Sequence, residues 1–238
     1  MKYGNKIKIL VIEDDVILAA LLQDAVFNAD EFEFTITHSF EEAKELLACL
    51  ELNSKLFDII VLDLKLPGGS GLDLLKGFRA TGNEHPVIIL SSKSAEDDRI
   101  AGLESGADDY LCKPFSLKEL YIRVKKIIKR SPAKGAKHPA AKVFISGDLT
   151  VNFNLREVFV KNSRIGLTPN EFDILKYLIE NKNTVIERNA LKADIWDGSP
   201  ITNGTIDSYV SRLRTKLSPC GDIIETIHGI GYKVKSDD

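Results

Sequence analysis

A carboxylate stands at the end of a segment that should otherwise be apolar. Residues 59–62 read IIVL, Asp63 follows them directly, and Pro67, Gly68 and Gly69 close the segment. A continuous apolar run of this length, ended by turn residues, is typical of a strand buried on both faces of a sheet. An ionised carboxylate is costly in such surroundings unless it is paired or solvated. Asp63 is therefore the first candidate for a chemical role.

Polar side chains also end the other strand-like runs of the first half of the chain. They are Glu13, Asp14 and Asp15 in the first run, Ser91 and Ser92 in the fourth, and Lys113 in the fifth. Clustered carboxylates repel one another unless a cation lies among them, and hard oxygen ligands select Mg²⁺ or a similar ion. A carboxylate can also attack phosphorus to form an aspartyl phosphate, whose charge a metal ion and an ammonium group stabilise. This chemistry predicts Asp63 as the nucleophile, with Lys113 and Ser91 holding the phosphoryl group.

The periodicity of the sequence indicates which elements position these groups. Strand-like runs occupy residues 6–13, 32–38, 57–64, 86–92 and 108–113. Segments with helical spacing alternate with them at residues 19–27, 40–50, 71–80 and 97–106, and a fifth opens at Ser116. This alternation predicts an α/β fold with a doubly wound, five-stranded parallel sheet. In such a sheet the carboxyl ends of the strands meet at one edge, where ligands bind.

Charge divides the chain into an acidic module, a basic tether and a neutral module. Residues 1–122 carry 12 basic and 22 acidic residues, residues 123–139 carry 7 basic and no acidic ones, and residues 140–238 carry 13 of each. Pro132, Gly135 and Pro139 prevent a helix from continuing through the tether. We therefore expect a first domain at residues 1–130, a linker at 131–141 and a second domain at 142–238.

Composition excludes several other classes of protein. The three cysteines lie far apart without a CxxC motif, which argues against a disulfide framework or a zinc site and favours reduced thiols in the cytoplasm. Apolar runs stay well short of the roughly 18 residues that a membrane-spanning helix needs, and the N-terminal stretch is too short and interrupted for a signal peptide. The sequence predicts a cytoplasmic protein with no membrane partner.

The second domain has the pattern of a smaller α+β fold. Alternating runs at residues 149–154 and 157–162 predict a small antiparallel sheet. Thr168 and Glu171 have the spacing of a capping box around a helix that opens at Pro169. Two further helices are predicted over residues 188–196, with Trp196 as a core anchor, and 204–217, before a glycine hairpin over 223–234.

The helix predicted at residues 204–217 has an apolar face and a small polar face. The polar face carries Gly204, Ser208, Ser211 and Thr215, with Arg212 and Arg214 on its flanks. Small polar groups between arginines suit a helix in the major groove of DNA, with the arginines reaching phosphates. The alternative is an ordinary solvated helix face. The zero net charge of residues 140–238 favours that alternative, since strong nucleic-acid binders are usually basic.

Several long motifs carry a resemblance to known families. Residues 7–130 resemble a response-regulator receiver domain through the stretches ILVIEDD, IIVLDLKLPGGSGLDLL, VIILSSKSAEDDRIAGLESGADDYLCKPF and SLKELYIRVKKII. Residues 143–235 resemble a winged-helix output domain through LTPNEFDILKYLIEN, IDSYVSRLRTKL and IETIHGIGYKV. The whole chain is similar to the OmpR/PhoB subfamily of two-component transcription factors.

The resemblance implies a role for each residue of the receiver pocket. The phosphoacceptor would be Asp63, the ligands of Mg²⁺ would be Glu13, Asp14, Asp63 and the backbone carbonyl of Lys65, and the phosphate-binding and switch residues would be Ser91, Tyr110 and Lys113. It also implies a cis peptide bond between Lys113 and Pro114.

The resemblance implies two interfaces as well. DNA contacts would come from Thr205, Ser208, Ser211, Arg212 and Arg214 of the recognition helix and from Thr226, His228 and Tyr232 of the wing region. Thr205 and Ser208 lie nearest the helix start, where base edges are usually met. A symmetric receiver dimer would pair Arg99 with Glu119, Asp109 with Arg123, and Asp108 with Arg130. The segment 196–203 matches the loop that contacts RNA polymerase in relatives.

The sequence thus predicts a phosphorylation-switched transcription regulator, not an enzyme. A sensor histidine kinase would phosphorylate it with Mg²⁺, and the resulting homodimer would bind tandem half-sites of double-stranded DNA. One alternative is a dimeric transcription factor that works without phosphorylation and has a vestigial pocket. Another is an aspartyl-phosphate phosphatase, which the sequence disfavours because Lys65, and not a second acid, stands two residues after Asp63.

Overall fold

A computed structural model of the chain describes residues 6–25, 31–53, 56–92, 96–130, 142–196 and 201–235. The chain divides into two compact units, residues 1–128 and 129–238. Helix α5 (Leu117–Arg130) spans the point of division, and the expected linker at 131–141 lies outside the described residues. Each unit contains its own sheets and its own helices.

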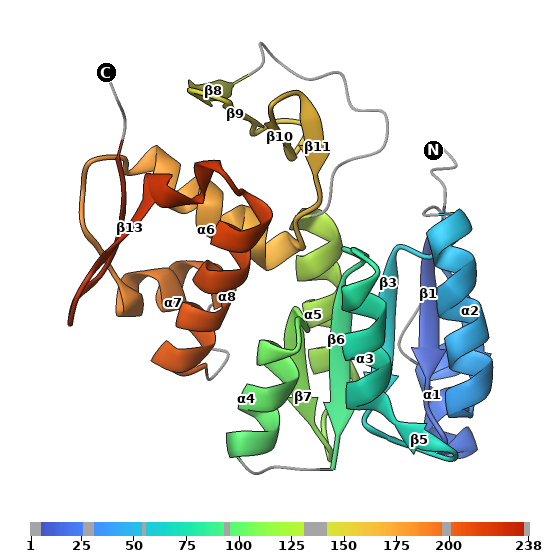
Figure 1. Cartoon of the computed structure of the whole chain (residues 1–238). Coiled ribbons are helices and arrows are strands. Elements are labelled where there is room, and N and C mark those ends of the chain that lie inside the picture. Colours follow the sequence, from blue (N-terminus) through green and yellow to red (C-terminus); the bar gives the residue numbers. More distant parts are fainter. Residues whose placement is uncertain are drawn as a thin grey trace. The chain divides into compact units, whose positions relative to one another are not determined.

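The first unit is built on a five-stranded parallel sheet with the strand order β2-β1-β3-β6-β7. The strands are β1 (Ile7–Ile12), β2 (Phe32–Thr37), β3 (Ile59–Asp63), β6 (Val87–Ser91) and β7 (Asp109–Cys112). The helices that alternate with them are α1 (Val16–Ala25), α2 (Phe40–Leu52), α3 (Gly71–Ala80), α4 (Glu96–Glu104) and α5, as Figure 1 shows. The predicted doubly wound sheet is confirmed.

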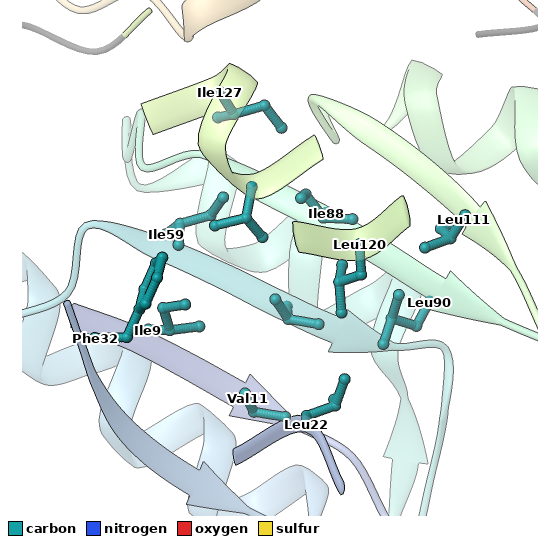
Figure 2. Close-up of a cluster of buried hydrophobic side chains, with 12 residues drawn as sticks. Ile9, Val11, Leu22, Phe32, Ile59, Ile88, Leu90, Leu111, Leu120 and Ile127 are labelled. Carbon is teal, nitrogen blue, oxygen red and sulfur yellow. The ribbon is translucent and has the colours of Figure 1, made fainter. Parts of the chain in front are cut away.

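Both faces of this sheet are buried. Ile9 and Ile59 of the strands pack with Leu22 of α1 and Leu120 of α5 in one apolar cluster, drawn in Figure 2. Successive side chains of a strand point to opposite faces of the sheet, so Ile60 points away from the face that carries Ile59. Ile60 is as buried as Ile59. Parallel sheets require this double cover, which leaves the ends of the strands as the place where polar chemistry can reach water.

Local capping sets the start of two of the helices. Helix α1 begins at Val16, three residues before the predicted start at residue 19, because Asp15 caps it. The Oδ1 atom of Asp15 accepts hydrogen bonds from the backbone N–H groups of Ile17 and Leu18, at 2.9 and 3.1 Å. At α5, the Ser116 hydroxyl accepts the N–H of Glu119 at 3.0 Å.

The turn after β3 is built for close approach of the backbone. Two short strands, β4 (Lys65–Leu66) and β5 (Gly69–Ser70), form a hairpin that the sequence did not predict. Gly71 follows as the first residue of α3, and a Cβ atom added there would lie 2.1 Å from the carbonyl oxygen of Asp63. Only glycine therefore allows α3 to start directly against the end of β3.

The second unit has the predicted smaller α+β architecture. An antiparallel sheet of order β11-β10-β9-β8 comes first, formed by β8 (Val143–Ser146), β9 (Leu149–Asn152), β10 (Glu157–Val160) and β11 (Ser163–Ile165). Next come α6 (Pro169–Glu180), β12 (Ile186–Glu187), α7 (Arg188–Trp196) and α8 (Asn203–Lys216). After the 3-10 turn η1 (Cys220–Ile223), the hairpin of β13 (Ile224–Ile227) and β14 (Gly231–Val234) pairs with β12.

Packing in this unit supports two of the sequence-based predictions. Thr168 and Glu171 form a complete capping box at the start of α6. Trp196 is buried, with its ring centroid 5.3 Å from that of Tyr209 in α8. Strand β12 was missed because two residues are too few for any periodicity. The described residues contain no helix that is both long enough and apolar enough to cross a membrane.

Candidate functional sites

The carboxyl ends of the strands bring an acidic cluster and a lysine together. Glu13 follows β1, Asp63 ends β3, and Lys113 follows β7. One ligand oxygen from each of Glu13, Asp14 and Asp63 lies within 4.8 Å of the other two. Glu13 and Asp63 are buried, whereas Asp14 is exposed at the mouth of the cluster. The grouping that the strand ends suggested is therefore present in three dimensions.

Lys113 neutralises part of this cluster. Its Nζ atom donates to both carboxylate oxygens of Glu13 at 2.7 Å and also to Oδ2 of Asp63. The other oxygen of Asp63, Oδ1, accepts the backbone N–H of Lys65 at 2.8 Å. Both oxygens of Asp63 thus have a fixed orientation, which suits a nucleophile that must present one of them to an incoming group.

Burial shifts the pKa values of both Glu13 and Lys113. Burial raises the pKa of Glu13 to about 7, opposed by its hydrogen bond from Lys113 and reinforced by the charge of Asp63. Burial by itself would lower the pKa of Lys113, but its bonds to Asp63 and Glu13 outweigh burial and raise it. The oxygen donors of Glu13, Asp14 and Asp63 are of the type that Mg²⁺ prefers.

The two predicted switch residues lie on neighbouring strands. Ser91 is fully buried at the end of β6, and Tyr110 of β7 is also buried. A Cβ atom added at Gly102 of α4 would lie 3.0 Å from the Tyr110 ring, so the ring packs directly against α4. The peptide bond between Lys113 and Pro114 is cis, as the resemblance implied.

The charged residues proposed for a receiver dimer have partners within their own chain. Arg123 Nη1 donates to both carboxylate oxygens of Asp109, at 2.9 and 2.7 Å, and Nη2 donates to Glu119 at 2.8 Å. Asp108 is buried and accepts the N–H of Val87 at 2.9 Å and a long bond of 3.4 Å from Arg79. Pairing across a twofold axis stays a prediction, and for Arg123 it requires an exchange of partners. The remaining two members, Arg99 and Arg130, lie on α4 and at the end of α5.

Two of the residues predicted to contact DNA are buried. Thr205 is fully buried, and its hydroxyl lies 3.1 Å from that of Thr202, which caps α8. Tyr232 is also buried. The side chains of Thr205 and Tyr232 thus bond within the domain, and a DNA contact by either of them stays a prediction. Ser211 and His228 are exposed, and Ser208 and Thr226 are half-buried.

The two arginines of α8 also have partners inside the domain. Arg214 donates to the carbonyl oxygen of Ile224 at 3.0 and 2.7 Å and to the Thr226 hydroxyl at 2.7 Å, so it fastens α8 to β13. The guanidinium of Arg212 lies 4.5 Å from the ring centroid of Tyr209. Arg214 is therefore a structural link as well as a candidate phosphate contact.

The sequence did not predict one group of polar contacts at this surface. Arg188, the first residue of α7, donates from Nε to Oδ1 of Asp207 at 2.7 Å, and the Tyr232 hydroxyl donates to the same oxygen. Asp207 lies three residues after Gly204 and four before Ser211, so it shares their exposed face. That spacing was the available signal. The segment 196–203 is described only in part, since residues 197–200 lie outside the described residues.

Comparison with known proteins identifies the families that the two parts of the chain match. Residues 9–125 match the response regulator receiver domain, and residues 162–234 match the transcriptional regulatory protein C-terminal family. The regulatory protein VanR of Enterococcus faecium is 35% identical over 234 residues, which cover 96% of this chain and 98% of VanR. DrrB of Thermotoga maritima, an OmpR/PhoB homolog, is 28% identical over 98% of this chain and all of its own, with a TM-score of 0.48. A RitR mutant, 20% identical over 97% of this chain and 99% of its own, has a TM-score of 0.68.

Proposed function

The chain belongs to the OmpR/PhoB subfamily of response regulators and so regulates transcription in response to phosphorylation; within that role we propose that Asp63 is the phosphoacceptor. The observation that carries this proposal is the hydrogen bonding of Asp63, whose two carboxylate oxygens are held by Lys113 and by the backbone of Lys65. Asp63 is also a member of the acidic cluster at the strand ends.

The proposed reaction transfers one phosphoryl group to this carboxylate. An oxygen of Asp63 forms a bond to phosphorus, while the bond between phosphorus and the donor, a histidine nitrogen of a sensor kinase, breaks. The Lys113 ammonium, which forms ion pairs with both Glu13 and Asp63, would hold a phosphoryl oxygen afterwards. The Ser91 hydroxyl would donate a hydrogen bond to a second phosphoryl oxygen, and Tyr110 on the adjoining strand would change its position in response.

The acidic cluster would hold Mg²⁺ through Glu13, Asp14, Asp63 and the backbone carbonyl of Lys65. When bound, the ion would offset the negative charge of the carboxylates and of the phosphoryl oxygens. Asp14 is the exposed member of this set, and the buried Glu13, whose pKa is about 7, would bind the ion in its deprotonated form.

The proposed output is the binding of tandem DNA half-sites by a cytoplasmic homodimer. The receiver would dimerise through the face of α4, β7 and α5 that carries Asp109, Glu119 and Arg123. Helix α8 would enter the major groove, with the β13–β14 hairpin as a wing and His228 exposed at its turn. The loop at 196–203 would contact RNA polymerase. Dephosphorylation of Asp63 would be slow and would be the only catalytic property of the chain.

Phosphorylation-dependent DNA binding tests this function. Full-length wild type and Asp63→Asn are treated with acetyl phosphate and Mg²⁺, weighed by intact mass spectrometry, and titrated with genomic DNA fragments. Wild type should gain one phosphoryl group and bind DNA at least about 10-fold more tightly, whereas the variant should gain none and keep its basal affinity. EDTA should abolish the mass gain in wild type.

Three outcomes would contradict the proposal. An equal mass gain in Asp63→Asn would show that another residue is the phosphoacceptor. A phosphoryl mass gain that EDTA does not diminish would show that phosphorylation needs no metal ion. Tight DNA binding that does not change when wild type is phosphorylated would favour the alternative of a phosphorylation-independent transcription factor.

A further inference from the structure

The exposed face of α8 carries a single acid, Asp207, one turn after the helix begins. Its neighbours on that face are Gly204 and Ser211, which have no charge. An acid is unexpected on a surface that approaches the DNA backbone, because the phosphates are negative. The burial of Thr205 makes this acid more prominent, since the start of the helix then presents Gly204, Asp207 and the half-buried Ser208.

The carboxylate of Asp207 is held by one oxygen and open at the other. Both donors, Arg188 Nε at 2.7 Å and the Tyr232 hydroxyl, bond to Oδ1. Within the described part of the chain, no hydrogen bond ends on Oδ2, and about half of the side chain, 49%, is exposed. A fixed carboxylate with one free oxygen is a pre-organised hydrogen-bond acceptor.

The groups behind Asp207 keep this geometry at neutral pH. The guanidinium of Arg188 lies 5.0 Å from the ring centroid of Tyr232, and that of Arg214 lies 5.8 Å from it. Burial, with the hydrogen bond to Asp207, raises the pKa of Tyr232 to about 12, so its hydroxyl remains a donor. The positive charge of Arg188 offsets the repulsion that Asp207 would otherwise exert on the phosphates.

We propose that Asp207 discriminates between bases, its Oδ2 accepting a hydrogen bond from an exocyclic amino group in the major groove. Cytosine N4 and adenine N6 are the two such groups, whereas guanine O6 and thymine O4 are acceptors that a carboxylate repels. Arg188 and Tyr232 act as positioning residues, since they fix the opposite oxygen. This inference rests on the proposed placement of α8 in the major groove.

A purely structural role for Asp207 makes a different prediction. In that case the bonds from Arg188 and Tyr232 only fasten α8 to α7 and to β14, and replacing Asp207 would lower DNA affinity equally on all sequences. A base-discriminating role changes which sequence is preferred. Sequence preference is therefore the decisive readout, and affinity is not.

The test is a selection from a randomised duplex library with the phosphorylated full-length protein. Wild type is compared with Asp207→Asn, whose amide both donates and accepts, and with Asp222→Asn as the control. Asp222 lies exposed in η1, outside α8, so the control removes the same charge from the same domain. Wild type and the control should enrich cytosine or adenine at one position of each half-site, and the base enriched identifies which amino group is bound.

In Asp207→Asn that preference should fall by roughly 10-fold or more, as expected for the loss of a specific base contact. Arg188→Gln is a second variant, which keeps the carboxylate but removes one of the two donors that fix it. It should weaken the same preference in part, and thermal unfolding shows whether each variant is folded. An unchanged preference in a folded Asp207→Asn or Arg188→Gln would overturn the proposal.

Failure of the inference differs from failure of the proposed function. If wild type selects a defined site that Asp207→Asn selects equally well, the DNA interface stands and Asp207 is structural. If wild type selects guanine or thymine at every discriminating position, amino-group recognition is wrong. If phosphorylated wild type selects no sequence at all, the placement of α8 in the major groove fails, and the inference fails with it.

Discussion

At the scale of single residues, the receiver pocket is defined by charges that are difficult to keep buried together. Glu13 is fully buried, Asp63 nearly so, and Lys113 bonds to both. Removing one partner of such a group leaves an uncompensated charge, which costs more than the pair itself contributes. In the proposed function this clustering of carboxylates would favour a further cation, Mg²⁺.

The raised pKa of Glu13 leads to a prediction about pH and stability. Its folded-state pKa of about 7 lies above the ordinary value of 4.5, so the folded protein binds the proton more tightly than the unfolded chain. The resulting stability is complete below about pH 4.5 and is lost as the pH rises through about 7. In metal-free protein, the free energy of unfolding of wild type relative to Glu13→Gln should therefore fall between pH 5 and pH 8, by about 1–3 kcal/mol.

Urea unfolding at several pH values in EDTA measures this trend. Glu42→Gln is a suitable control, because hydrogen bonds from Thr37 and from the backbone of His38 lower the pKa of Glu42. A lowered pKa affects stability only at acidic pH, so this variant should track wild type between pH 5 and pH 8. A Glu13→Gln difference that is flat over that range would show that Glu13 is charged throughout.

At the scale of elements, the pocket depends on how closely α3 can start behind β3. The first residue of α3, Gly71, leaves no room for a side chain beside the carbonyl of Asp63, and its N–H donates to the carbonyl of Leu64 at 3.0 Å. This contact fixes the path of the chain directly after the phosphoacceptor. A change of one methyl group in this turn should therefore disturb both folding and phosphorylation.

Two glycines of α3 provide a matched pair for this prediction. Gly71→Ala should destabilise the protein by at least about 1–3 kcal/mol, because backbone must move, and should slow phosphorylation by acetyl phosphate. Gly77→Ala places its methyl group in open space within the same helix and should stabilise the protein by about 0.5–1 kcal/mol. Thermal unfolding and intact mass measure both effects. Equal behaviour of the two variants would rule out the close-approach argument.

At the scale of the whole molecule, charge is distributed unevenly along the chain. The first 122 residues have a balance of −10, the next 17 a balance of +7, and the last 99 a balance of zero. A neutral DNA-binding domain releases few counterions, so its own affinity for DNA should be modest. Joining two such domains in a dimer raises the effective concentration of the second at a tandem site. Dimerisation is therefore the step that should convert phosphorylation into tight binding.

A substitution of Arg123 tests this dimerisation step. In the monomer it binds its own Asp109 and Glu119, and in the proposed dimer it would bind Asp109 of the second copy. Arg123→Ala should weaken the phosphorylated dimer by about 10-fold or more, since a twofold axis repeats each lost pair. Lys118→Ala, an exposed cation of the same helix, is the control. Analytical ultracentrifugation at a protein concentration of tens of micromolar measures the fraction of dimer. Phosphorylated wild type that stays monomeric would contradict the proposed dimer.

The sequence by itself determined the order of the strands of the parallel sheet along the chain, the helices between them, and which residues gather at the strand ends. Buried parallel strands must be apolar, so a polar residue such as Asp63 at a strand end is visible as an exception, and the parallel sheet gathers such residues at one edge. Only the tertiary structure decided which side chains of α8 face outward. Thr205 and Tyr232 are buried, and Asp207 is held by groups 19 and 25 residues away. Contacts at that separation depend on how α7, α8 and β14 pack together, which no local periodicity encodes.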